Sequence, residues 1–295
     1  MRVLITGATG QAGSALVRHL AARGDEVVGL ARSVPESAAK VSWIRADICN
    51  EAQVADAIAG AGRLDAIVHA AADIQGATGP ARQLQTNVLG TAHLLAAAQN
   101  AAVPRFVFFS GLSVLGRPLY IPVDEGHPIA PQSVYVHSKY CAEGLVLLAD
   151  SATFATAALR ISSPVGEGAG RGRIFDLFVR RALQGERLLL NGSGKRRQNY
   201  VDVRDIAQAV ERVITRRAAG LFNIGSAEAT SNLELAQTCI AVLSSASGVA
   251  FSDAPDPDEE VRWDLSIEKA RNELGYEPRY TLADSIRSHA SSLKP

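Results

Sequence analysis

The chain has few cysteines, no excess of either charge and no long apolar run. Its three cysteines, Cys49, Cys141 and Cys239, lie far apart with no His or Cys neighbour at metal-binding spacing. An odd, scattered set argues against a disulfide framework and favours reduced thiols in a reducing compartment. The sequence also predicts no bound metal.

The charges balance, with 30 basic and 30 acidic residues and a formal net charge of zero. Binding of nucleic acid or of a membrane surface usually draws on excess positive charge, so we expect neither partner. No stretch reaches the roughly eighteen apolar residues of a membrane span, and the chain opens on a strand instead of a leader peptide. These absences predict a cytoplasmic protein.

The most informative feature that is present is a glycine turn at the start. It reads Gly7-Ala8-Thr9-Gly10-Gln11-Ala12-Gly13 and lies between an apolar, β-branched run and residues with helical apolar spacing. Strand, glycine turn and helix in this order are typical of a dinucleotide site, where backbone N–H groups at a helix N-terminus approach a pyrophosphate. A plain βα turn is the alternative. We expect cofactor contacts from Gly7, Thr9, Gly10, Gln11 and Gly13.

Strand-like runs alternate with helical ones through the first half, at residues 26–30, 41–45, 65–70, 105–110 and 155–161. This rhythm predicts an α/β fold, a Rossmann-type doubly wound parallel sheet covered on both faces. We expect residues 1–161 to form the NAD(P)-binding domain. From Ser162 the rhythm loosens, which predicts a smaller substrate-binding lobe over residues 162–295, with residues 199–225 returning to the main sheet.

Tyr135 and Lys139 lie four residues apart, so a helix would place both on one face. A free phenol has a pKa of about 10, and a nearby ammonium and a positive nicotinamide ring should lower it. Tyr135 could then take a hydroxyl proton while a hydride leaves carbon. A chance pair on a helix surface is the alternative.

These features together resemble the extended short-chain dehydrogenase/reductases, the NAD-dependent epimerase/dehydratase family, over nearly the whole chain. Further similar segments are residues 45–48, 69–72, 87–91 and 192–205, the last resembling the stretch that holds the diphosphate of a nucleotide sugar. The resemblance implies cofactor contacts from Asp47, Ile48, Ala70, Ala71, Ala72, Asn87, Tyr135 and Lys139, with Lys139 on the nicotinamide ribose. Asp47 could instead cap the following helix, and Asn87 could support the site's backbone.

The resemblance also implies a homodimer that joins through helices, including the Tyr135 helix. Cys141, Leu145 and Leu148 could serve that interface or the core equally well. His69, His93 and His137 are expected to be structural, because none pairs with plausible metal ligands.

The third catalytic position departs from the family pattern. Hydroxyl residues and then Val-Tyr-Gly usually follow the fifth strand, whereas this chain has Ser110-Gly111-Leu112-Ser113-Val114-Leu115-Gly116. Glycine stands where the resemblance places the hydroxyl, so either Ser113 or Ser110 would serve, with Ser113 favoured. The family's 4,6-dehydratases carry an acid pair here, its decarboxylases a Glu and its 3,5-epimerase-reductases a Cys. This segment contains neither an acid pair, nor a Glu, nor a Cys, so of the family's reactions hydride transfer at a secondary alcohol remains.

Other positions bear on cofactor and substrate. Arg32 and Ser33 end the second strand where an acidic residue would bind the ribose of NAD, which favours NADP; a solvated Arg stacked on adenine is the alternative. Arg196 and Arg197, beside Lys195, suit a diphosphate, and Arg262 and Ser162 are further substrate candidates.

The sequence therefore predicts a 4-epimerase of a nucleoside diphosphate sugar. The first alternative is an NADP-dependent ketoreductase or dehydrogenase of a sugar or other small carbonyl compound. A non-catalytic dinucleotide-sensing regulator is a remote alternative, which the presence of both Tyr135 and Lys139 disfavours.

Overall fold

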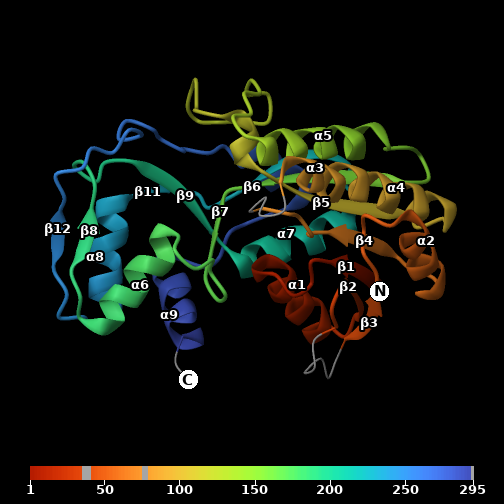
Figure 1. Cartoon of the computed structure of the whole chain (residues 1–295), viewed down its shortest axis with the longest axis horizontal. Helices are drawn as coiled ribbons and strands as arrows, with labels where there is room; N and C mark the ends of the chain where they lie inside the picture. Colours follow the sequence, from red (N-terminus) through yellow and green to blue (C-terminus); the bar gives the residue numbers. More distant parts are fainter. Residues whose placement is uncertain (35–40, 75–78, 294–295) are drawn as a thin grey trace.

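The computed structural model describes residues 1–34, 41–74 and 79–293. A larger lobe holds a seven-stranded sheet, and a smaller lobe gathers α6, α8 and α9 beside short strands (Figure 1). The elements are β1 (Arg2–Thr6), α1 (Gln11–Ala22), β2 (Glu26–Ala31), β3 (Ser42–Arg45), α2 (Glu51–Gly60), β4 (Ala66–His69), α3 (Pro80–Leu84), η1 (Gln85–Leu89), α4 (Gly90–Asn100), β5 (Arg105–Gly111), η2 (Leu112–Leu115), α5 (Val134–Leu148), β6 (Ala155–Ile161), β7 (Ser163–Val165), α6 (Ile174–Gln184), β8 (Leu188–Leu190), β9 (Arg197–Asp202), α7 (Val203–Arg216), β10 (Gly220–Ile224), β11 (Ala229–Ser231), α8 (Asn232–Val242), β12 (Val249–Phe251), η3 (Ala270–Leu274) and α9 (Leu282–Ser292).

The main sheet runs in the order β10-β6-β5-β4-β1-β2-β3, and every neighbouring pair is parallel. The chain proceeds outward from β1 to β3, then returns and proceeds outward from β4 to β6. The order therefore reverses between β1 and β4, the point at which such sheets bind ligands. This arrangement confirms the predicted Rossmann-type doubly wound sheet.

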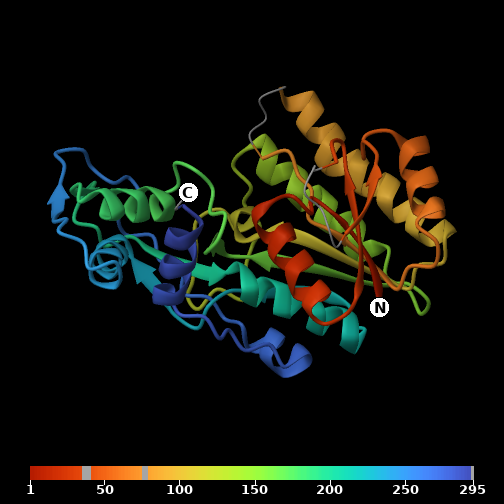
Figure 2. The same ribbon diagram turned by 90° about the horizontal axis from the view of Figure 1, so that it is seen from below.

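Both faces of the sheet are covered, as the apolar composition of the strands requires. One buried cluster joins the sheet to α1 and α7, and a second joins it to α2, α4 and α5. Figure 2 shows these two sets of helices on opposite sides of the strands. Within the described part of the chain, no helix is long and apolar enough to cross a membrane.

The return of the chain to the main domain differs from the sequence prediction. β10 pairs with β6, and α7 packs against α1, but β9 pairs with β7 and β11 in a separate three-stranded sheet. The prediction that residues 199–202 rejoin the main sheet was therefore wrong. A later segment also returns, because Leu265, Ile267 and Tyr276 are buried in the α1–α7 core.

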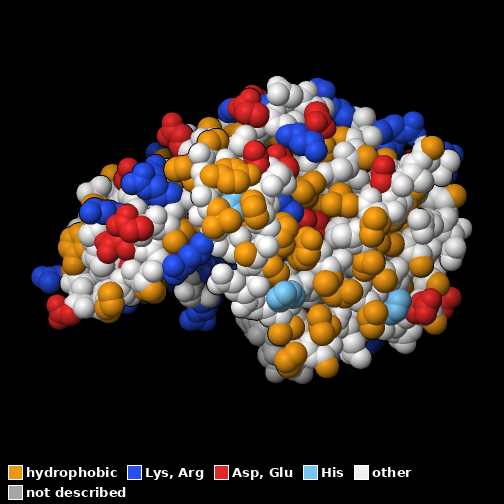
Figure 3. Space-filling model, turned by 90° about the horizontal axis from the view of Figure 1, so that it is seen from above, with side chains coloured by type: hydrophobic (Ala, Val, Ile, Leu, Met, Phe, Trp, Pro, Cys, Tyr) orange, Lys and Arg blue, Asp and Glu red, His pale blue; other side chains and the backbone are white. Residues whose placement is uncertain are grey.

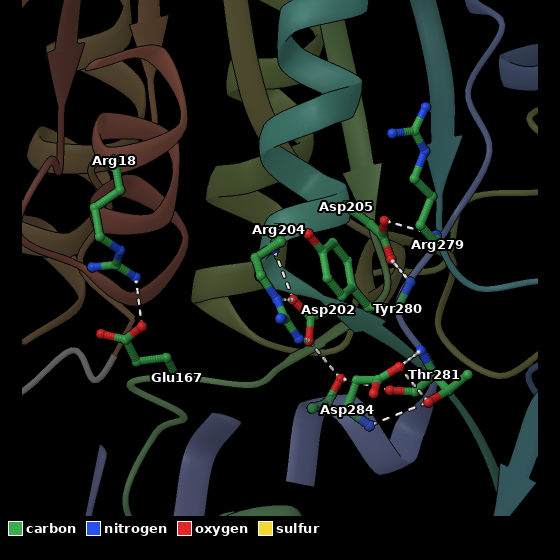
Figure 4. Close-up of polar contacts among 10 residues, drawn as sticks. Arg18, Glu167, Asp202, Arg204, Asp205, Arg279, Tyr280, Thr281 and Asp284 are labelled. Carbon is green, nitrogen blue, oxygen red and sulfur yellow. Dashed lines mark hydrogen bonds and ion pairs between the residues drawn. The ribbon is translucent and has the colours of Figure 1, made fainter. Parts of the chain in front are cut away.

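Residues at the start of α7 bind the segment that precedes α9 (Figure 4). The Asp205 carboxylate accepts hydrogen bonds from the backbone N–H groups of Arg279 and Tyr280 at 2.9 and 3.1 Å. The Arg204 guanidinium lies 3.6 Å from the centroid of the Tyr280 ring. Burial raises the pKa of Asp205 to about 6. These contacts hold the smaller lobe against the larger one.

Candidate active site

The candidate site lies at the carboxyl edge of the main sheet. The glycine turn follows β1, residues 70–73 follow β4, and Ser110 to Ser113 span the end of β5 and the start of η2. Because the strands are parallel, these segments reach the same edge. Residues that are far apart in the sequence therefore meet around the reversal point of the sheet.

The glycine turn forms a cradle that fits a diphosphate. A Cβ on Gly13 would lie 2.1 Å from the Gly7 carbonyl oxygen, and one on Gly7 would lie 2.6 Å from the Ala71 nitrogen. The first turn of α1 has no side-chain cap and no acidic residue, which leaves its N–H groups available to an anion. The buried Gln11 Nε2 also has no hydrogen-bond partner. These features suit the pyrophosphate of a dinucleotide.

The candidates after β2 and β3 lie in different settings. Arg32 and Ser33 are exposed at the end of β2. The Asp47 carboxylate pairs with Arg82 at 2.7 Å and accepts from the Cys49 backbone nitrogen, while Asn50 provides the N-cap of α2. Capping of α2 by Asp47 was therefore a wrong alternative. Ile48 is buried, and its side chain lies where a Cβ on Gly90 would collide with it.

Asn87 supports the segment that follows β4. Its Oδ1 accepts from the Asp73 backbone nitrogen at 2.7 Å, and its Nδ2 donates to Ser138 Oγ at 2.8 Å. Ala71 donates from its backbone nitrogen to Thr6 Oγ1 at 3.3 Å. Asn87 thus ties the loop that includes Ala70, Ala71 and Ala72 to the helix that carries the catalytic candidates.

Tyr135 and Lys139 both lie on α5. Lys139 is buried, with its ammonium 4.0 Å from the centroid of the Phe108 ring, and burial lowers the pKa of Lys139 to about 7. Burial raises the pKa of Tyr135 above 10, and the Arg173 guanidinium opposes that rise. In the protein alone, desolvation has the larger effect on the phenol pKa, and the lowering expected from Lys139 together with a bound nicotinamide stays a prediction.

The two candidate serines have different environments. Ser110 is buried and donates to Glu143 Oε2 at 2.7 Å. Ser113 is exposed on η2, and its Oγ lies 3.6 Å from the position that a Cβ on Gly111 would take. The Ser113 hydroxyl therefore lies close to where a side chain at position 111 would begin, whereas the Ser110 hydroxyl is already engaged.

A pocket of about 270 Å³ lies at the start of α6, beside β7, β9 and α8. The Gln198 amide, oriented with its oxygen toward Arg196, accepts from Arg196 Nε and Nη2 at 3.1 Å. Arg196 Nη1 also lies 3.4 Å from an Asp258 oxygen. The pocket residues are Ser163, Pro164, Val165, Ala169, Gly170, Arg173, Ile174, Phe175, Arg196, Gln198, Tyr200 and Asn232.

The predicted arginine cluster is divided between two pockets. Arg197 and Arg262 line a second pocket of about 240 Å³, together with Lys195. Arg197 there donates to the Ala229 carbonyl oxygen and lies 3.4 Å from Glu234. Arg196 lies just before β9 and Arg197 is its first residue, and in extended backbone such neighbouring side chains point to opposite faces. The structure therefore places the two predicted guanidinium groups in different pockets, and their roles in binding substrate stay predictions.

Two buried hydroxyls near the first pocket lack hydrogen-bond partners. They are Ser162 Oγ, at the end of β6, and Tyr200 OH, in the pocket wall. Buried polar atoms of this kind are usually satisfied, so both atoms are available to a ligand or to water. Ser162 was among the predicted substrate residues, whereas Tyr200, Gln198 and Arg173 were not. Residues 196, 198 and 200 are alternate positions of an extended segment, so the sequence could have indicated that they share one face. No pattern in the sequence indicated Arg173.

The histidines make internal contacts. Buried His69 bonds to Thr6 Oγ1 at 2.6 Å and to Thr91 Oγ1 at 3.0 Å, and burial lowers its pKa to about 3. His93 contacts the Ile48 carbonyl oxygen at 2.9 Å, and His137 is exposed. Among the described residues, no group of three His, Cys, Asp or Glu side chains could hold a metal ion.

Comparison with known proteins adds to this geometry. A family model for the NAD-dependent epimerase/dehydratase family matches residues 3–225. The dTDP-glucose 4,6-dehydratase of Streptomyces antibioticus is 32% identical, over 97% of this chain and 90% of that protein. The UDP-glucose 4-epimerase of Mycolicibacterium smegmatis is 31% identical, over 97% of this chain and 96% of that protein. The Thermus thermophilus UDP-glucose 4-epimerase complex with NAD has a TM-score of 0.84 at 26% identity, covering 99% of this chain and 98% of that one.

The desolvated ammonium of Lys139 makes a prediction about stability. Since its folded pKa is about 7, below the unfolded value of 10.5, the unfolded state holds more protons between these values and stability rises with pH across that window. Below this pH window, the folded state carries the full free-energy cost of burying the ammonium. We expect Lys139→Met to stabilise the cofactor-free protein by about 2–4 kcal/mol near pH 6.

This gain should shrink toward pH 10, and urea unfolding at both pH values measures it. A variant that is less stable than the wild type near pH 6 would contradict the buried ammonium.

Proposed function

The chain belongs to the NAD-dependent epimerase/dehydratase family, and we propose that it is a 4-epimerase of a nucleoside diphosphate sugar. The membership confirms the resemblance that the motifs indicated. As an enzyme of the extended short-chain dehydrogenase/reductase type, it uses NAD(P) for hydride transfer. The relatives include both epimerases and dehydratases, so the choice of reaction depends on the site itself.

The observation that carries the proposal is the chemistry of residues 110–116. They contain serines but neither a carboxylate nor a thiol. Elimination of water and epimerisation beside a carbonyl both need a second proton carrier at the substrate. Glu143, the buried carboxylate nearest to Ser110, is held by Ser110 and by Arg160. Hydride transfer with one acid/base group is the reaction that the remaining residues support.

The first pocket supports a nucleoside diphosphate substrate. It presents the guanidinium groups of Arg173 and Arg196, which suit a diphosphate, and the unpaired hydroxyl of Tyr200. Arg173 acts electrostatically on Tyr135, so it links this pocket to the catalytic helix. A diphosphate bound between the two arginines would present its sugar to Tyr135.

The proposed mechanism assigns one task to each group. When bound, the nicotinamide supplies the acceptance and return of a hydride. Tyr135 takes the proton of the sugar's 4-hydroxyl and later returns it to the same oxygen. Ser113 donates a hydrogen bond to that oxygen, and Lys139 holds the nicotinamide ribose beside Tyr135. Net redox change is zero if the sugar turns its other face before the hydride returns.

A second candidate is an NADP-dependent ketoreductase or dehydrogenase. Arg32 and Ser33 favour it, because they are exposed at the strand end where an acidic residue would bind the adenosine ribose of NAD. An arginine fork suits a 2′-phosphate. The identity of the retained dinucleotide separates the two candidates.

The first test combines mass spectrometry of the dinucleotide released from purified protein with assays on UDP- and dTDP-hexoses. We expect retained NAD, inversion at C4 and no net change in nicotinamide absorbance. Tyr135→Phe should keep the dinucleotide but lower kcat by about 10²–10⁴-fold, because general acid/base catalysis is lost. Stoichiometric oxidation of NADPH would make the protein a reductase. A dinucleotide complex inactive on every hexose would favour the sensing regulator.

The division of the arginines predicts different effects of two neighbouring substitutions. We expect Arg196→Ala to raise KM for the nucleotide sugar by about 10–100-fold, since a charge-assisted contact to the diphosphate is lost. Arg197→Ala, the matched control on the opposite face of β9, should change KM less than about threefold. Steady-state kinetics measure both values. Equal effects would place the diphosphate elsewhere.

We also propose a homodimer through the face formed by α3, α4 and α5. Apolar side chains are spread over this face (Figure 3). Leu84, Leu89, Tyr140, Leu145 and Leu148 are between 36% and 86% exposed, and Cys141 is exposed too. The exposed positions 134, 137, 141, 145 and 148 form one stripe along α5. A second copy would bury that stripe.

Leu145→Glu should therefore convert the dimer to a monomer, because it places a charge in the apolar interface. Leu189→Glu is the matched control, since Leu189 is 45% exposed on β8 in the smaller lobe. Sedimentation velocity distinguishes the two species. A wild-type monomer, or a Leu145→Glu dimer, would reject this interface.

A further inference from the structure

Behind Lys139 lies a buried cluster of Ser110, Glu143 and Arg160. Arg160 donates from Nη2 to Glu143 Oε1 at 2.7 Å and from Nε to Oε2 at 3.1 Å. Ser110 Oγ donates to the same Oε2 at 2.7 Å. The Arg160 and Glu143 side chains are 3% and 2% exposed. The Glu143 carboxylate is thus fixed by three hydrogen bonds from two neighbouring strands, β5 and β6.

Glu143 lies four residues after Lys139 on α5, so both side chains project from one face of the helix. Lys139 is 4% exposed and lies over the Phe108 ring, and among the described residues no carboxylate is hydrogen-bonded to its ammonium. Among the other titratable groups, His69 on β4 interacts electrostatically with Lys139, Tyr135 lies four residues earlier on α5, and Arg160 on β6 is bound to Glu143. Glu143 is the anionic member of this set.

We propose that Glu143 is a positioning residue for Lys139. Its carboxylate, fixed by Arg160 and Ser110, keeps the Lys139 side chain in the ammonium form that holds the cofactor ribose. The cluster thereby sets the pH range in which the cofactor binds. The inference rests on the cofactor role proposed for Lys139, but it does not depend on the sugar or on the epimerase step.

The electrostatics around Lys139 agree with this geometry. Burial lowers the pKa of Lys139 to about 7, and the charge of Glu143 opposes that lowering. His69 does not compete for the proton, because burial lowers its pKa to about 3 and leaves it neutral at working pH. The Phe108 ring adds a cation–π contribution that also favours the charged form.

The cluster also bears on the choice between the two candidate serines. Because the Ser110 hydroxyl donates to Glu143, it belongs to the carboxylate cluster, which leaves Ser113 for the substrate.

The test measures the dissociation constant of NAD against pH by calorimetry, with no sugar present. In the wild type, affinity should weaken above about pH 7 as the Lys139 ammonium is lost, by up to about tenfold per pH unit. In Glu143→Gln the onset should move about one unit lower, since the anion that favours the ammonium is gone. Affinity near pH 5.5 should stay within about twofold of the wild type.

The opposite substitution supplies the sharper comparison. Arg160→Gln leaves the Glu143 carboxylate without its cation, so the onset should move to higher pH. General damage to the fold cannot shift the onset in opposite directions in the two variants. Glu211→Gln is the matched control: Glu211 pairs with His19 on α1 and with Arg23 at its C-cap, and its loss should leave the onset in place.

Three results would overturn the proposal. They are a wild-type affinity that is flat between about pH 6 and 9, a Glu143→Gln affinity that falls equally at all pH values, and an Arg160→Gln onset that moves downward. If neither variant folds, a flat wild-type profile still overturns the proposal. Failure of the sugar assay with these pH shifts intact would reject the epimerase and leave the role of Glu143 standing.

Discussion

The site depends on the close contact between α1 and β1. With a Cβ on Gly13 only 2.1 Å from the Gly7 carbonyl, any side chain there would push the helix off the strand. The contact brings the open N-terminus of α1 to the reversal point of the sheet. The anion cradle follows from the missing side chain of Gly13, and the approach of Gly7 to the loop after β4 follows from the missing side chain of Gly7.

The sheet was predictable because its strands are short, apolar and separated by helical patterns, which is a local signal. The position of β9 was not, since its pattern resembles that of a main-sheet strand and only its pairing with β7 and β11 separates the two cases. The return of Leu265 and Tyr276 to the main core was missed for the same reason. Such pairings depend on tertiary contacts that periodicity does not encode.

The candidate site could likewise be predicted only in part from the sequence. The glycine turn and the Tyr135–Lys139 spacing are local patterns, and the structure brings them to one edge. Ser110 and Ser113 differ in environment because Ser110 donates to Glu143, which is remote in sequence. Arg196 and Arg197 line different pockets because neighbouring side chains in extended backbone point to opposite faces. The raised pKa of Tyr135 could not be predicted from spacing, because burial decides its direction.

The late return of residues 220–224 and 265–276 to the larger lobe has a consequence for synthesis on the ribosome. Until these residues emerge, the β6 edge lacks its neighbour β10, and the core beside α7 lacks Leu274 and Tyr276. The first half of the chain must therefore wait with an unpaired strand edge and exposed apolar surface, a state in which nascent chains depend on chaperones. The two lobes complete their folding almost together, although most of the larger one is translated first.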